Sequence, residues 1–398
     1  MIAILGTALA IMMIMSIVVV DEIRNISISP ENHRDRTYYI KYQIVKDSVK
    51  NNWNGGLIDY SIYRDYLADL SIPECVSLYM PLTIPIGKEG TDETVKAKAK
   101  VTNASFWKIM DFVFIEGKPF GQEEFESGVA QVVISETIAK QIFKGEKVIG
   151  QTLSVNFTPY RIVGIVKDIS PVFNAASGDI WLPATSLESF MRSNQYTILL
   201  LLKNKNDYLK LEQEVRNIEK KYGANNPNEV LVLRGPDSHK EYQIDVDGMT
   251  NEEKKQDLSI LYRKQILIFL ILLLIPAINL SGLSLSRIKK RTAEIGVRKA
   301  FGAKKYIILI QVLYENLITS LLGGLIGLCL SYFAVYQLKK WLLKIPADSS
   351  VPTDAFISFP VFLAVFIVCL LINLLSAGIP AWRASKMSIV NSLNENDK

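Results

Sequence analysis

Four long runs without a charged residue interrupt an otherwise polar chain. They cover residues 1–20, 265–286, 317–336 and 356–382. Each reaches the roughly 20 residues that a helix needs to cross about 30 Å of hydrocarbon. The pattern therefore predicts a helical membrane protein with four transmembrane helices. The first run has neither a basic leader nor a small-residue cleavage site, which favours a membrane span over a cleaved signal peptide.

The long polar segment between the first two runs, residues 21–251, has the mixed pattern of an α+β domain. Short β-branched and aromatic stretches predict strands at 129–135, 152–157, 160–166 and 196–202, and alternation around Pro81 and Pro85 predicts a small sheet within 73–101. Helical spacing predicts helices at 136–143 and 208–222, and 171–177 and 223–228 have the composition of surface loops. At this length the domain can form its own core, organised as two subdomains.

Residues 252–264 are polar, have helical spacing, and run without a breaker into the second apolar run. This pattern predicts a stalk helix that projects from the membrane.

The charge of the loop at 287–305 determines the predicted orientation. It holds eight basic residues and one acid, Glu294. Short loops rich in Lys and Arg stay on the cytoplasmic side, whereas a long domain can be translocated whatever its charge. The domain at 21–251 is then extracytoplasmic, 306–336 forms an interfacial segment and the third span, and 337–355 is a short outer loop whose lysines count against this orientation. After the fourth span, the tail at 383–398 is cytoplasmic.

The same basic loop also has the signals of a short helix. Thr292 can cap its start, Glu294 lies in the first turn where the helix dipole favours an acid, and Gly302 can end it after Phe301. Glu294 and Arg298 are spaced as an i,i+4 ion pair. A capped helix held at both ends by the bilayer is suited to contact with a cytoplasmic partner. The alternative is that these residues bind anionic lipid headgroups.

The residues needed for catalysis are sparse. His33 and His239 lie far apart among charged residues, a setting more typical of solvated side chains than of ligands. No HExxH, CxxC or GxSxG motif occurs, and no GxxxxGK[ST] motif offers a phosphate cradle. We therefore expect no enzyme activity, metal site, cofactor or nucleic-acid partner for this chain.

The third apolar run carries a stripe of small residues, with Gly323 and Gly327 in a GxxxG spacing. Small residues let helices approach closely, either within one subunit or between subunits. Glu315, the acid nearest to this run, is expected at the inner interface because a carboxylate at the bilayer centre is costly.

Taken in order, these segments resemble a known family. The run at 294–303 (EIGVRKAFGA), Glu315, the GGLIG at 323–327 and the PAWRAS at 380–385 resemble the FtsX-type permease domain, although Ile389 stands near a position where that domain usually has a proline. The large domain is similar to the MacB-type periplasmic core. That likeness rests on the FW at 106–107, VVIS at 132–135, VGIV at 163–166 and WLP at 181–183.

The resemblance implies a permease subunit of an ABC-type export or mechanotransmission system in the inner membrane, with its large domain in the periplasm. It implies a separate cytoplasmic ABC ATPase, a second permease subunit, and a periplasmic or outer-membrane partner in some members. By carry-over, the ATPase-coupling residues are Glu294, Arg298, Lys299 and Phe301. Export of drugs or peptides, lipoprotein handling and FtsX-like control of a cell-wall hydrolase all stay open. From another class, an ATPase-independent membrane receptor also fits.

Overall fold

The computed structural model describes residues 25–50, 52–91, 93–244 and 300–342 without a break, and single positions or short runs within 5–17, 251–298 and 363–382. The chain divides into two compact units. We call the unit that contains Arg24–Ile260 the α/β unit, and the one that contains Leu261–Leu342 with both chain ends the helical unit. Each is described by itself.

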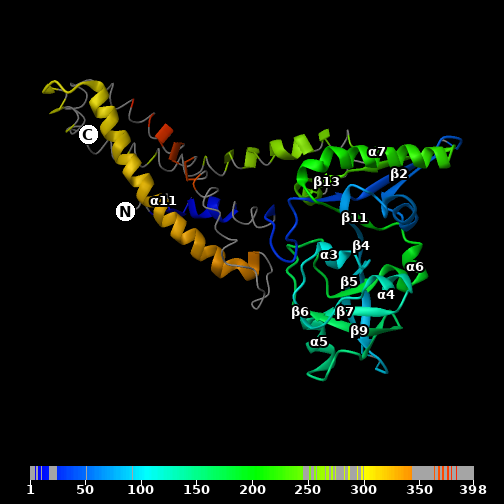
Figure 1. Ribbon diagram of the computed structural model, residues 1–398. Coiled ribbons are helices and arrows are strands. Elements are labelled where there is room, and N and C mark those ends of the chain that lie inside the picture. The colour runs from blue at the N-terminus through cyan, green and yellow to red at the C-terminus, as the bar shows by residue number, and fades with distance from the viewer. Residues whose placement is uncertain are drawn as a thin grey trace. The chain divides into compact units, whose positions relative to one another are not determined.

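A ten-stranded sheet forms most of the α/β unit (Figure 1), in the order β13-β1-β11-β4-β5-β10-β7-β9-β6, with β8 pairing with both β4 and β9. The strands of this sheet are β1 (Thr37–Ile40), β4 (Pro73–Lys88), β5 (Val95–Thr102), β6 (Phe114–Gly117), β7 (Gln131–Ser135), β8 (Thr152–Val155), β9 (Thr158–Val166), β10 (Ile180–Pro183), β11 (Thr197–Leu202) and β13 (Asp237–Ser238). Because β8 joins β4 to β9, the strands β4, β5, β10, β7, β9 and β8 close into a ring, which we call the barrel. Closure removes sheet edges that would otherwise be free to pair.

The long strand β4 belongs to both parts of the sheet. Its first half pairs with β11 up to Tyr79, and from Tyr79 onward it pairs with β5. Tyr79 is opposite Thr197 on one side and Thr102 on the other. One strand therefore links the barrel rigidly to the β11–β1–β13 end of the sheet.

A second sheet of three strands, in the order β12-β2-β3, packs with the longest helix of this unit. Its strands are β2 (Tyr42–Asp47), β3 (Asn52–Leu57) and β12 (Glu229–Arg234). Helix α7 (Tyr208–Asn225) buries Leu211, Val215 and Ile218, which recur at helical spacing. The shorter helices are α2 (Tyr60–Ile62), η1 (Tyr63–Leu67), α3 (Phe106–Ile109), α4 (Gln122–Glu126), α5 (Glu136–Phe143), η2 (Ala184–Ser186), α6 (Glu188–Met191), η3 (Lys205–Asp207) and α8 (His239–Ile244).

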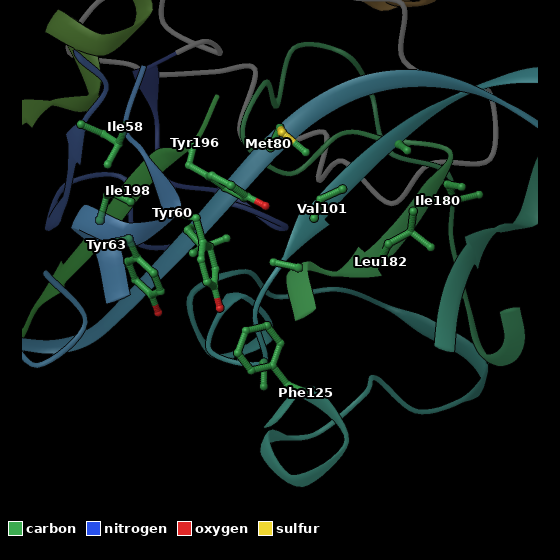
Figure 2. Close-up of a cluster of buried hydrophobic side chains, with 14 of the residues drawn as sticks. Ile58, Tyr60, Tyr63, Met80, Val101, Phe125, Ile180, Leu182, Tyr196 and Ile198 are labelled. Carbon is green, nitrogen blue, oxygen red and sulfur yellow. The ribbon is translucent and has the colours of Figure 1, made fainter. Parts of the chain in front are cut away.

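One hydrophobic core runs through the α/β unit. Figure 2 shows part of it, which includes Tyr60, Tyr63 and Tyr196 together with Val101 and Leu182 of the barrel strands. We expected two subdomains; the structure instead has one compact unit whose two sheets share this core.

The predicted strands at 129–135, 152–157, 160–166 and 196–202 are confirmed as β7, β8, β9 and β11 to within a few residues, and the predicted helix at 136–143 is α5. Two loop predictions are confirmed in part. Helix α7 continues through Gly223 to Asn225, so the loop comprises only residues 226–228 of the predicted segment. The segment at 171–177 is a loop, but Phe173, Ala175 and Ala176 within it are buried. The strands β1, β2, β3, β6, β10, β12 and β13 were not predicted.

In the helical unit, helix α11 spans Lys305–Leu342 without a break. Within the described residues, one helical stretch, Leu309–Ala334, is long and apolar enough to cross a membrane. It starts earlier than the predicted third span and includes Glu315, which we had placed before the span. Helix α11 also continues into the predicted outer loop at 337–355. Most of the other three predicted spans, and the tail at 383–398, lie outside the described residues.

Candidate functional site

The predicted coupling helix ends at Gly302, as its sequence indicated. Gly302 has a φ of +89°, a conformation that costs glycine nothing. The N–H of Ala303 donates to the carbonyl of Arg298 at 2.9 Å, and the N–H of Phe301 donates to the carbonyl of Val297 at 3.1 Å. A left-handed glycine with this reach-back bond is a common helix C-cap. The chain therefore turns sharply between the coupling helix and α11.

The side chains of this helix end are displayed outward. Phe301 is 89% exposed and Val297 is 46% exposed. Glu294 and Arg298 form the predicted pair, at 4.0 Å and in an exposed position. Arg298 also donates from Nη1 to Oε1 of Gln311 on α11 at 2.7 Å, a contact that was not predicted. Lys299, the remaining predicted coupling residue, lies outside the described residues.

The small-residue stripe on α11 is buried. Gly323, Gly327, Ser320 and Ser331 all belong to the buried face of this helix. A Cβ at position 327 would lie 2.8 Å from the carbonyl oxygen of Ala8 and 3.0 Å from Cβ of Ile11. Gly327 therefore permits close contact between α11 and the first apolar run of the same chain.

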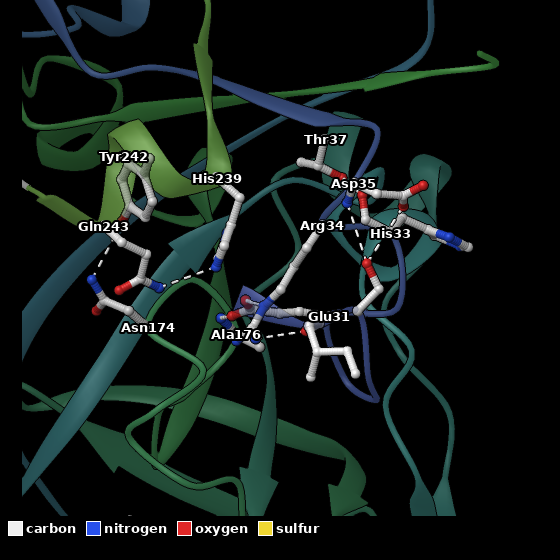
Figure 3. Close-up of polar contacts among 12 residues, drawn as sticks. Glu31, His33, Arg34, Asp35, Thr37, Asn174, Ala176, His239, Tyr242 and Gln243 are labelled. Atoms are coloured by element: carbon white, nitrogen blue, oxygen red, sulfur yellow. Dashed lines mark hydrogen bonds and ion pairs between the residues drawn. The ribbon is translucent and has the colours of Figure 1, made fainter. Parts of the chain in front are cut away.

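A group of buried polar side chains lies around helix α8, the last helix labelled in the α/β unit along the chain (Figure 3). Tyr39 stacks on Tyr242 with ring centroids 4.2 Å apart, and its hydroxyl is 3.1 Å from Nδ1 of His239. Nε2 of His239 faces the amide of Gln243 at 3.3 Å. We expected His239 to be solvated; this was wrong, because it is only 4% exposed and bound within this group.

The segment that enters the α/β unit meets the loop between β9 and β10. Glu31 and Arg34 form a buried ion pair at 2.8 Å, and Glu31 also accepts the backbone N–H of Ala176 at 3.1 Å. The guanidinium of Arg34 lies 4.9 Å from the ring centroid of Phe173. These contacts explain why the segment at 171–177 is not a free surface loop: its backbone and Phe173 complete the burial of a charged pair.

Lys100 of β5 is also part of this group. Its Nζ donates to the carbonyl of Asn174 at 2.5 Å and lies 4.3 Å from the ring centroid of Tyr79. Burial lowers the pKa of Lys100 to about 7, against the opposing pull of Glu31. Burial also raises the pKa of the Tyr39 and Tyr79 hydroxyls, so both stay protonated.

We call Glu31, Arg34, Tyr39, Tyr79, Lys100, Asn174, His239 and Tyr242 the buried polar cluster. No part of it has the arrangement of a metal site, and the described residues as a whole contain no group of three or more His, Cys, Asp or Glu able to hold a metal ion.

Comparison with known families covers most of the chain. Residues 1–218 match the MacB-like periplasmic core domain, and residues 266–389 match the FtsX-like permease C-terminal domain. The chain belongs to the MacB/FtsX-type ABC transporter permeases. The α/β unit lies in the periplasmic core match as far as residue 218, and α11 lies in the permease match.

Curated relatives agree with the family. The macrolide export ATP-binding/permease protein MacB of Chromobacterium violaceum is 25% identical over 301 residues, covering 75% of this chain and 43% of that protein. The protein of the same name from Escherichia coli K12 is 24% identical over 253 residues, covering 62% of this chain and 37% of that protein. The chain thus spans less than half the length of these relatives.

Among solved structures, the periplasmic region of MacB from Actinobacillus actinomycetemcomitans is similar at 14% identity, covering 55% of this chain and 98% of that one with a TM-score of 0.37. The extracellular domain of the noncanonic ABC-type transporter YknZ from Gram-positive bacteria is similar at 13% identity, covering 50% and 100%, with a TM-score of 0.38.

Proposed function

We propose that this chain is the permease subunit of an ABC-type system in which a separate cytoplasmic ATPase drives conformational work in the periplasm. The observation that carries the proposal is the helix end at 297–302, in a chain that matches both the periplasmic core and the permease domain of this family. There Phe301 is displayed almost completely, on a helix fixed by the turn at Gly302 and by the Arg298–Gln311 contact.

Phe301 and Val297, one helical turn apart, together expose apolar surface at this helix end, and contiguous apolar surface is suited to contact with a partner. Aromatic residues are also over-represented among residues that contribute most to binding. Glu294, Arg298 and Lys299 around it would supply the charged rim of the contact with the ATPase. Anionic lipid is the alternative partner, because it would bind the basic residues and an aromatic ring can insert at the bilayer surface; the co-purification test below distinguishes the two.

In this proposal the chain crosses the inner membrane four times, with the α/β unit in the periplasm. Two such subunits pair, and the helix at 252–264 acts as a stalk. The relatives are named for macrolide export, so macrolide-type compounds are the first cargo to test. Peptide or lipoprotein handling and control of a cell-wall hydrolase are the alternatives.

The test is to extract the C-terminally tagged full chain gently from its native membrane and assay the co-purified material for vanadate-sensitive ATP hydrolysis. A stoichiometric ATPase is expected with the wild type. Phe301→Ala should lose most of the bound ATPase, because the change removes the exposed ring and disturbs no packed side chain.

Phe157→Ala is the matched control. Phe157 is 84% exposed but belongs to the α/β unit, so its removal should leave the ATPase bound. If no ATPase co-purifies with a folded wild-type chain, the hypothesis of an ATPase-independent membrane receptor is favoured instead. An ATPase recovered together with a cell-wall hydrolase would favour the FtsX-like regulator.

A further inference from the structure

Tyr242 contacts three separate parts of the α/β unit. Its ring stacks on Tyr39 of β1, with an interplanar angle of 10°. Its hydroxyl is hydrogen-bonded to the hydroxyl of Tyr79 on β4 and accepts from the amide of Asn174 at 3.4 Å. One side chain of α8 therefore touches two strands of the large sheet, β1 and β4, and the loop between β9 and β10.

Two of these contacts, with Tyr79 and with Asn174, connect Tyr242 to the barrel. Tyr79 is the residue at which β4 exchanges its partner β11 for β5, so it lies where the barrel joins the rest of the sheet. The backbone carbonyl of Asn174 also accepts a hydrogen bond from the ammonium of Lys100. This bond anchors the same loop to the barrel strand β5. A displacement of Tyr242 would reach the barrel through both Tyr79 and Asn174.

The two chain segments that border the α/β unit meet at this cluster. The unit begins at Arg24 and its main segment ends at Ile260. Shortly after the beginning, Glu31 and Arg34 hold the loop at 173–176; shortly before the end, α8 presents Tyr242 to the same loop. In sequence, both segments adjoin the runs predicted to cross the membrane.

A buried, hydrogen-bonded arrangement of this kind resists sliding. Each polar group left without its partner would cost roughly 1–3 kcal/mol, so intermediate positions are disfavoured and the cluster moves as a block or rearranges as a block. An apolar interface of the same size tolerates gradual repacking much better.

We propose that the buried polar cluster is the contact through which movement of the membrane-proximal segments is passed to the periplasmic barrel, with the Tyr242 hydroxyl as its central link. This inference rests on the proposed function, since it supplies the path by which ATP-driven movement would reach the barrel. Tyr242 acts here as a positioning residue and touches no cargo.

The test uses the full chain with its co-purified ATPase in lipid nanodiscs. Hydrogen–deuterium exchange is measured on the segment 170–177 and on β5, with and without ATP and vanadate. In the wild type, trapping is expected to change exchange in both segments. Tyr242→Phe keeps the ring stack on Tyr39 but removes the hydroxyl, and should reduce the nucleotide-dependent change roughly five-fold, the factor that one hydrogen bond of about 1 kcal/mol represents.

Tyr196→Phe is the matched control. Tyr196 is fully buried and its hydroxyl donates to the carbonyl of Phe190 at 2.9 Å, away from the cluster, so this variant should respond as the wild type does. Should Tyr242→Phe fail to fold, Tyr79→Phe removes the same hydrogen bond between the two hydroxyls by deleting that of Tyr79. The same reduction in response is then expected.

The outcomes separate the two proposals. A folded wild type that co-purifies no ATPase overturns the proposed function and this inference with it. A wild type that holds its ATPase but shows no nucleotide-dependent change in the two segments overturns this inference alone, and so does a Tyr242→Phe variant whose response is undiminished or whose ATPase is lost. Support requires that Tyr242→Phe reduce the response roughly five-fold while its ATP hydrolysis and bound ATPase stay at the wild-type level.

Discussion

Arg298 and Gln311 are joined by a hydrogen bond of 2.7 Å across the turn that separates the helix ending at Gly302 from α11. Gln311 lies in the second turn of α11, so the contact closes the bend made by Gly302. Arg298 thus has an intramolecular role in addition to its charge. Replacing Arg298 would remove its charge and its hydrogen bond to Gln311 at once. A change at Gln311 removes the hydrogen bond alone.

We expect Gln311→Ala to weaken coupling while leaving the charge of Arg298 in place. For an exposed pair the bond contributes about 1 kcal/mol, which corresponds to roughly a five-fold change in the population of the closed bend. The stimulated rate of ATP hydrolysis in the co-purified complex should fall two- to five-fold by this estimate.

Glu294→Gln provides the comparison. The Glu294–Arg298 pair is exposed and 4.0 Å apart, so loss of the pair itself should cost less than about 0.5 kcal/mol. A larger fall in the rate with Glu294→Gln would come from the contact with the ATPase that we propose for Glu294, and not from its pairing with Arg298. Gln311→Ala with a wild-type rate would mean that the closed bend does not matter for coupling.

We expect Gly327→Ala to destabilise the helical unit. The new methyl group would lie 2.8 Å from the carbonyl of Ala8, a backbone atom that cannot rotate away. Overpacking of this kind costs about 1–3 kcal/mol, which a thermal melt of the detergent-solubilised full chain would show as a lower Tm.

Gly282→Ala is the control for that experiment. A Cβ at position 282 meets nothing within 4 Å, and alanine favours a helix over glycine by about 1 kcal/mol. Its Tm should be unchanged or raised. Equal losses in both variants would mean that helix propensity or membrane insertion, not close contact with Ala8, sets the requirement for glycine.

The features that the sequence predicted well are those with local causes. Helix α5 follows from apolar spacing at Ile138, Ala139 and Phe143 and from Ser135, whose hydroxyl accepts the N–H of Ile138 at 3.3 Å. The end of the coupling helix follows from Gly302 alone. Such signals lie within one helical turn of the residues that they control.

The features that the sequence did not predict depend on residues far apart in the chain. His239 is buried because it meets Tyr39, which is 200 residues away, and the loop at 171–177 is buried by Glu31 and Arg34. Local composition made all of these positions look solvated, since a charged or polar residue is usually exposed. Closure of the barrel by β8 is likewise a pairing of distant strands that no local pattern encodes.

We expect Phe157→Gly to stabilise the α/β unit. Asn156 and Phe157 form the turn between β8 and β9 with φ values of +48° and +65°, where glycine is preferred at the second position. A left-handed conformation costs an L-residue about 1–2 kcal/mol, which glycine avoids. Glycine in turn loses more chain entropy on folding, which costs about 0.5–1 kcal/mol. A net gain of a few tenths to 1 kcal/mol should appear as a higher Tm.

Phe157→Ala distinguishes the cause. Alanine keeps the Cβ that makes the left-handed conformation unfavourable, and the ring of Phe157 buries little because it is 84% exposed. Its Tm should therefore match the wild type. A gain with alanine equal to that with glycine would assign the effect to loss of the exposed ring.

We expect Lys100→Met to change the pH dependence of stability. In the unfolded chain a lysine has a pKa near 10.4, whereas burial lowers the pKa of Lys100 to about 7 in the folded protein. Between these values the unfolded chain binds one more proton than the folded chain, so Lys100 makes stability rise with pH. Below about pH 7 both states are protonated and the penalty for burying the ammonium is at its full size.

Methionine has a similar length and no charge, so Lys100→Met should be more stable than the wild type at pH 6 to 7, and this advantage should shrink as the pH rises toward 10. The groups that act on Lys100, namely Glu31, the Tyr79 ring and the carbonyl of Asn174, are present in both proteins, so their own contributions largely cancel in the difference. The measurement is Tm against pH for the full chain, with Lys98→Met as control, because Lys98 lies exposed on the same strand. Curves for Lys100→Met and wild type that run parallel from pH 6 to 10 would mean that Lys100 keeps its proton in the folded protein, held by Glu31 and the Tyr79 ring more strongly than burial opposes it.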